Sequence, residues 1–210
     1  MTTDSSSLEV YFTRADGAYL FARWGRPIVP VVIGVDDATL GVVKGAIEAV
    51  VALAQHEMAE TDPELGVNLM LLFFRDWREL LDTPGLDQLV PELANLVPKL
   101  EAANANQYRL FRFDAEGAIQ ACFGFVRMDE TLQDVPAEAL SLSIAVQSIL
   151  LWSDTAFRDT SPLANTDDGL TVLKPEIAEI VRAAYDPILS NVADDSSHAL
   201  RLTARLDSGQ

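Results

Sequence analysis

The chain has 210 residues, 49% of them hydrophobic and 22% charged, so it can bury most of its apolar surface in one globular domain without disulfides. Its 32 acidic residues outnumber 15 basic ones, and the resulting net charge of -17 repels phosphate backbones, so we expect no nucleic-acid partner. No apolar run reaches the length of a membrane span, and the single cysteine, Cys122, excludes an intramolecular disulfide and a cysteine-based zinc site.

The chain begins with a polar stretch, residues 1–7, that predicts a flexible leader. A leader of this kind is also what remains when an export signal is removed. Residues 8–24 then hold two aromatic-rich apolar runs around Ala15-Asp16-Gly17, which predicts a hairpin. In the next apolar run, strand character is strongest from Val31 to Ile33, and Gly34 ends it.

A long helix and a buried strand follow. Asp36 or Asp37 can cap a helix whose apolar residues keep helical spacing, and we expect this helix to extend to about Ala59. The run VNLMLLFF, residues 67–74, is continuously apolar and predicts a buried central strand.

The middle of the chain predicts a helical insertion and a second hairpin. Helical spacing recurs over about 76–104, with breaks expected at Pro91 and Pro98. Residues 108–113 and 118–127 are strand-like and flank a turn that contains Gly117.

The stretch PAEALSLSIAVQSILLWSD, residues 136–154, predicts the central helix of the domain because it is apolar on nearly every side. Its one polar line contains Ser143, Gln147 and Asp154, at offsets that place them on one helical face. We expect a site on this face of the helix.

A last amphipathic helix is predicted from Pro175 to Tyr185, after an irregular stretch that ends at Gly169. Residues 191–210 predict a polar C-terminal tail. The sequence thus indicates one domain, residues 8–190, with the helical insertion at about 76–104.

The order of these elements resembles the zinc-peptidase fold of the metzincins, and of the matrixin branch in particular. FARWGRPIVPVVIG with AIEAVVALAQH is similar to the matrixin opening strand and backing helix, and LTVLKPEIAEIVRAAYDP is similar to the closing helix with its tyrosine, here Tyr185. The segments QSILLWSD, SPLANTDD and AAYDP also resemble an uncharacterised family of bacterial envelope proteins. The resemblance implies an α+β fold of zincin-like architecture: a mixed twisted sheet with a long backing helix, a buried central helix and a C-terminal helix. It also implies a cleft between the central helix and the strand at 118–127.

The metzincin zinc motif has no counterpart in this chain. Aligning that motif with the central helix places Ser143 and Gln147 at the two helical zinc ligands, Ile144 at the general base and Leu150 at the glycine, while Ser153 takes the position of the third ligand. The resemblance therefore implies a degenerate site with no metal, no cofactor and no catalytic residue. Its candidate groove consists of Ser143, Ile144, Gln147, Ser153, Asp154 and Tyr185.

Other residues offer weaker chemistry. His56 and Glu60 have ligand-compatible spacing, but we interpret them as the polar end of the first long helix. Cys122 lies in an alternating strand and is interpreted as a buried, inert thiol. Asp167-Asp168 resembles half of a calcium loop and is interpreted as a turn, with weak calcium binding as the alternative.

These observations predict a non-catalytic, metal-free zincin-like binding or assembly protein with an unknown protein or peptide partner. The resemblance implies a periplasmic or envelope location, although a cytoplasmic one also fits the sequence. Two alternatives stay open: a hydrolase that uses a carboxylate pair such as Glu116 and Asp154, and a purely structural subunit of an oligomer. Trp152, at the end of the central helix, could form the floor of a pocket.

Overall fold

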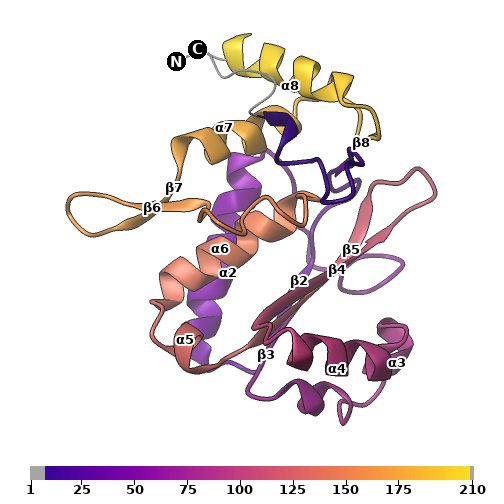
Figure 1. The fold of residues 1–210 in the computed structure, drawn as a ribbon, viewed down its shortest axis with the longest axis vertical. Helices are drawn as coiled ribbons and strands as arrows, with labels where there is room; N and C mark the ends of the chain where they lie inside the picture. Colours follow the sequence, from indigo (N-terminus) through magenta and orange to yellow (C-terminus); the bar gives the residue numbers. More distant parts are fainter. Residues whose placement is uncertain (1–7, 209–210) are drawn as a thin grey trace.

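The computed structural model describes residues 8–208, so the predicted leader lies outside the described residues. A four-stranded sheet separates two layers of helices (Figure 1). Its strands, in spatial order, are β2 (Pro30–Ile33), β3 (Leu69–Phe74), β5 (Ile119–Arg127) and β4 (Gln107–Phe113). The first three are parallel, and β4 runs antiparallel to β5 at the edge of the sheet.

The central strands are buried on both faces, as their continuous apolar sequences predict. A glycine fits between them: a Cβ atom at Gly124 would lie 2.6 Å from Leu71 Cδ2. Another glycine, Gly34, ends β2 in a left-handed conformation with φ 89°, and a Cβ there would lie 1.9 Å from the Phe73 carbonyl oxygen. The two glycines therefore allow close contacts that a side chain would prevent.

Helix α2 (Asp37–Leu53) lies beside α6 (Ala137–Ile149) on one face of the sheet (Figure 1). Asp36 caps α2, because its side chain accepts a hydrogen bond of 2.8 Å from the Thr39 amide. The predicted extension to Ala59 is wrong. Gln55 turns the chain with φ 52°, and His56 Nε2 then lies 2.8 Å from the Arg26 carbonyl oxygen. His56 and Glu60 consequently do not share a helix.

The predicted insertion covers the opposite face. It consists of the 3-10 helix η1 (Trp77–Leu80), α3 (Leu86–Leu89) and α4 (Leu93–Ala102), which bury Trp77, Leu86 and Val97 in a second core against β3 and β5. The helical break lies at Pro91, whereas Pro98 is accommodated within α4.

Helix α6 ends at Ile149, five residues before the predicted end at Asp154. Leu150 is extended, with φ -136° and ψ 156°, and the Leu151 amide donates to the Ala22 carbonyl at 2.9 Å. Residues 150–151 therefore run beside β1 (Phe21–Ala22), and the Ser153 amide donates to the Tyr11 carbonyl at 2.7 Å. Ser153 and Asp154 are not on the helix. A short helix, α5 (Glu130–Gln133), precedes α6.

The two ends of the described chain pack together above the sheet (Figure 1). The turn predicted at residues 15–17 is present, but it closes a single antiparallel bridge between Thr13 and Tyr19 rather than a full hairpin. Strand β1 pairs with β8 (Val192–Ala193), and α7 (Pro175–Ala184) covers the top of α2. A hairpin of β6 (Leu163–Asn165) and β7 (Thr171–Leu173) projects from one side (Figure 1).

The predicted polar tail instead contains α8 (Ser197–Ser208), which contributes to the main core. Ala199 and Leu202 are buried, and so is His198, whose ring lies against Phe21 with centroids 4.1 Å apart. His198 Nδ1 is 2.9 Å from the Tyr19 hydroxyl. This helix was not predicted because only a few of its residues are apolar.

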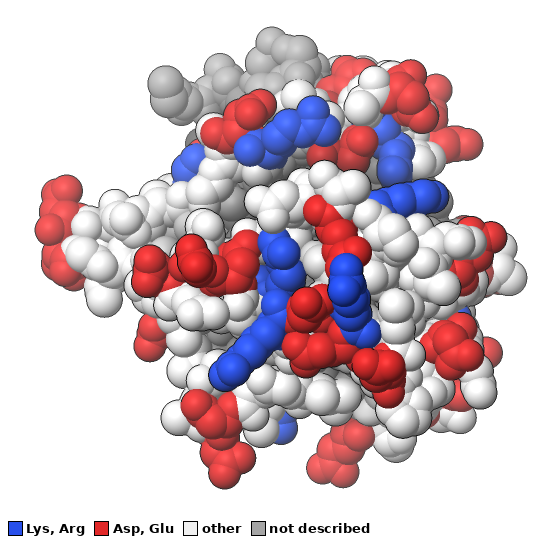
Figure 2. Space-filling model, turned by 60° about the horizontal axis from the view of Figure 1, so that its bottom comes forward, with Lys and Arg blue, Asp and Glu red and all other residues white. Residues whose placement is uncertain are grey.

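The surface carries paired charges. Figure 2 shows basic side chains beside acidic ones on the face that includes the lower end of the molecule. Ion pairs join Arg78 to Glu101 at 3.0 Å and Arg127 to Asp129 at 3.3 Å. None of the helices within residues 8–208 has the length and apolar character needed to cross a bilayer. The fold is a mixed α+β fold with helices on both faces of the sheet.

Candidate functional site

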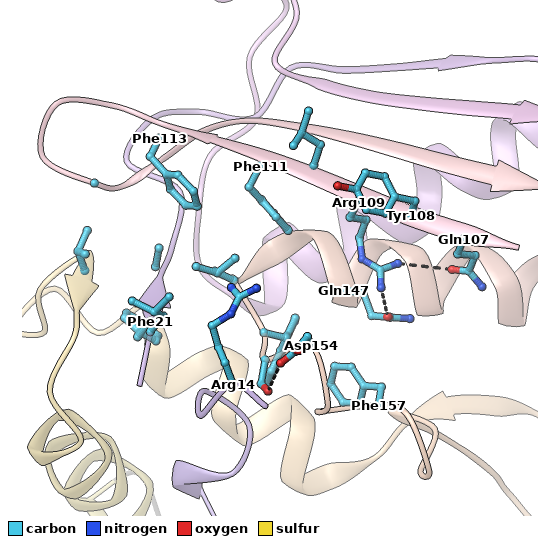
Figure 3. A pocket seen from close by; sticks show the side chains of 18 of the residues that line it. Arg14, Phe21, Gln107, Tyr108, Arg109, Phe111, Phe113, Gln147, Asp154 and Phe157 are labelled. Atoms are coloured by element: carbon cyan, nitrogen blue, oxygen red, sulfur yellow. Dashed lines mark hydrogen bonds between the residues drawn. The ribbon is translucent and has the colours of Figure 1, made fainter. Parts of the chain in front are cut away.

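A pocket of about 850 Å³ lies between the edge strand β4, the C-terminal end of α6 and the segment that follows it (Figure 3). Arg14 and Phe21 from the N-terminal segment and Val192 from β8 complete its lining. The prediction that the cleft lies beside the strand at 118–127 is wrong by one strand, because the pocket borders β4. Because β5 pairs with β3 on one side and β4 on the other, its backbone edges are both occupied.

Strand alternation gives β4 its pocket-facing side chains. Arg109, Phe111 and Phe113 point toward the pocket in Figure 3. The intervening Tyr108 and Leu110 pack against the second core under α4. The insertion therefore supports one face of β4, while the other face forms a pocket wall.

Three polar side chains form a chain of hydrogen bonds on the floor of the pocket. Gln147 Nε2 donates to Ser143 Oγ at 2.9 Å, and Gln147 Oε1 accepts from the Arg109 guanidinium at 2.5 Å. Arg109 also reaches Gln107 Oε1 at 3.5 Å (Figure 3). Ser143 and Gln147 can meet because they lie one helical turn apart.

Ser153 and Asp154 fasten the segment after α6 to the N-terminal segment. Ser153 Oγ donates to the Thr13 carbonyl at 2.7 Å, and Asp154 Oδ1 accepts from the Ala15 amide at 3.0 Å. That amide hydrogen bond, with the Arg14 charge nearby, holds the pKa of Asp154 below its usual value. Asp154 therefore stays ionised at neutral pH and is poorly suited to act as a general acid.

The six residues predicted for the groove separate into two groups. Gln147, Ser153 and Asp154 line the pocket, and Ser143 contacts it through Gln147. Ile144 is only 1% exposed and belongs to the core.

Tyr185 also lies away from the pocket lining. Its hydroxyl donates to the Ile149 carbonyl at 2.8 Å, and burial raises its pKa. Ile144 therefore packs into the core from α6, and Tyr185 supports the end of that helix from behind. Placing them in the groove is wrong, because the predicted groove combined residues from two sides of the helix.

Other candidates are dispersed in the structure. Glu116 lies in the turn between β4 and β5 and is not part of the pocket lining that contains Asp154. Cys122 is fully buried, which raises the pKa of its thiol to about 12, so it is a poor nucleophile. Asp167 and Asp168 lie in the β6–β7 turn, and within residues 8–208 no three His, Cys, Asp or Glu side chains gather as metal ligands.

Several pocket residues escaped sequence reasoning, above all Arg109, Arg14 and Arg158. The alternating sequence of β4 contained a signal for Arg109, since residues 107, 109, 111 and 113 must share one face. Trp152 does line the pocket, as the sequence suggested, with its indole nitrogen donating to the Val146 carbonyl at 2.8 Å.

Comparisons with protein-family models, curated proteins and solved structures give no match for this chain.

Proposed function

We propose that this chain is a non-enzymatic binding protein of zincin-like architecture that holds a segment of a protein or peptide partner in the pocket between β4 and α6. The observation that carries the proposal is the position of this pocket at an edge of the sheet. Within the described residues, β4 pairs with β5 alone, so its outer backbone edge is available for another strand. An extended segment can bind such an edge through main-chain hydrogen bonds while neighbouring pockets hold its side chains.

The chemistry of the pocket supports binding over turnover. Ser143 and Gln147 are neutral and hydrogen-bonded to each other, and Asp154 accepts from a backbone amide. In the matrixin-like alignment Ser143, Gln147 and Ser153 stand where the three zinc ligands would be, and Ile144 stands where the general base would be. Such side chains suit recognition by hydrogen bonding and apolar contact, and this favours a binding module over the hydrolase alternative.

The proposal also covers the zincin-like ancestry and an envelope location, both of which rest on the resemblance alone. Metal analysis of protein purified without chelator tests the first part. Zinc bound at one equivalent, and lost when Gln147 is replaced by Ala, would overturn the view that the site is metal-free. Fractionation of the native host tests the location, and the proposal requires the protein in the envelope fraction.

Selection from a random twelve-residue peptide library displayed on phage tests the binding function. Phe113 is 43% exposed on the pocket wall, so Phe113→Ser should weaken the selected peptides without unfolding the protein. Leu170, 61% exposed on the projecting β6–β7 hairpin, offers a matched control, and Leu170→Ser should leave binding unchanged. If no peptide is enriched, or both variants bind equally well, the proposed function is wrong.

A further inference from the structure

Arg109 is a partly buried cation at the floor of the pocket, and within residues 8–208 it has no carboxylate partner. Its hydrogen bonds go to the side-chain amides of Gln147 and Gln107, which are neutral. Desolvation lowers the pKa of its guanidinium, because burial disfavours the charged form. A buried charge with neutral partners alone is costly, and an anion that reaches it would offset this cost.

Two other arginines with little exposure, Arg26 and Arg23, have charged or more numerous partners. Arg26 pairs with both Asp62 and Glu64, at 3.4 and 2.8 Å. Arg23 donates to the carbonyl oxygens of residues 184, 186 and 189 and to the Asn191 side chain. Arg109 differs from both because its partners are two amides and it borders an open pocket.

Two more arginines border the same pocket. The Arg14 side chain extends into it (Figure 3), and Arg158 is exposed at its rim. The nearby carboxylate, Asp154, already accepts the Ala15 amide. Three positive charges and one negative charge leave the lining at +2, although the whole chain carries -17. The pocket is thus a local reversal of the charge of the molecule, which favours anions.

The remaining lining is rich in aromatic rings. Phe111 and Phe113 project from β4, and Phe21 and Phe157 lie across the pocket from them (Figure 3). Trp152 also belongs to the lining. Arg109 and Phe111 are two residues apart, so they lie on the same face of the strand. A partner strand on the free edge of β4 would repeat this spacing, with alternate side chains on the pocket side.

On the basis of the proposed function, we propose that the partner segment presents an aspartate or glutamate side chain to Arg109 and an aromatic or large aliphatic side chain two residues away to Phe111 and Phe113. Arg14 adds a second positive charge near the carboxylate, and Arg158 attracts the acidic segment at the rim. Arg109 confers specificity because an acid satisfies its guanidinium and a neutral side chain does not.

Peptides selected from the random library are the probe, measured by fluorescence anisotropy. The inference predicts enrichment of Asp or Glu two positions from a large apolar residue. Replacing that acid by its amide should weaken binding about 10- to 100-fold, as expected for the loss of a charged hydrogen bond. Arg109→Gln should bind the acidic and amide peptides equally, whereas Arg109→Lys should retain a preference for the acid.

Arg112→Gln is the matched control, because Arg112 lies on the opposite face of β4, where it donates to the Leu89 carbonyl. It should keep the full preference for the acid, and circular dichroism should show that all variants fold.

If Arg109→Gln fails to fold, Arg14→Gln in its place must reduce the preference. Enriched peptides that bind the pocket without an acidic preference would overturn this inference and leave the proposed function standing. A preference that survives Arg109→Gln would also overturn it, while the absence of any enriched peptide would contradict the proposed function itself.

Discussion

Lowering the pH from 7.5 to 4.5 should destabilise the wild-type protein by about 2.5 kcal/mol more than it destabilises a His198→Phe variant. His198 is 3% exposed in the core between α8 and β1, with its ring against Phe21. Burial, assisted by the positive charges of Arg201 and Arg23, lowers the pKa of His198 from 6.5 to about 4.

The sign follows from the two pKa values. In the unfolded chain His198 takes up a proton near pH 6.5, whereas in the folded protein it does so only near pH 4. Between these values the unfolded state binds more protons, so the free energy of unfolding falls as the pH falls. Phenylalanine fills a similar volume and does not titrate. The His198→Phe variant also loses the hydrogen bond with the Tyr19 hydroxyl, and this loss is independent of pH over this range.

Urea denaturation at several pH values measures this difference, with the fluorescence of the buried Trp24, Trp77 and Trp152 as the signal. The acidic residues and His56 titrate in both proteins, so their contributions cancel in the comparison. Parallel pH profiles for the two proteins would show that His198 is not held neutral by burial, and would refute the packing of α8 on which the prediction depends.

Two further predictions concern packing. Gly34→Ala should lower the free energy of unfolding, measured by urea denaturation, by about 1 to 3 kcal/mol, because of the positive φ at this position and the contact with the Phe73 carbonyl. Gly41→Ala, in an open part of α2, should raise it by about 0.5 to 1 kcal/mol in the same assay. Leu202→Ala should cost about 2 to 5 kcal/mol in urea denaturation, since this side chain is 0% exposed, and Leu200→Ala, at 60% exposure on the same helix, should be nearly neutral. Equal effects within either pair would contradict the structure.

Local patterns predict the centre of this fold well. The continuous apolar run that forms β3 and the turn before β5 indicate their structures without knowledge of the rest of the chain. The end of α6 is different. Leu150 to Trp152 continue the hydrophobic pattern of the helix, but their backbone bonds to β1, more than 120 residues earlier in the chain, determine their conformation. Such non-local partners override a local preference and cannot be inferred from spacing alone.

The same dependence on non-local contacts explains why the candidate site was predicted only in part. The polar line of α6 indicates Gln147, and strand alternation contains the position of Arg109. Their meeting depends on the placement of β4 beside α6, which is a tertiary contact. Arg14 and Arg158 come from irregular segments, where no period relates a residue to a face.

The pairing of β1 with β8 has a consequence for biosynthesis. Phe21 pairs with Ala193, and Arg23 binds carbonyl oxygens between residues 184 and 189. During translation β1 therefore cannot pair with β8 until residue 193 has emerged from the ribosome. A chain truncated before residue 193 would lack the pairing of β1 with β8.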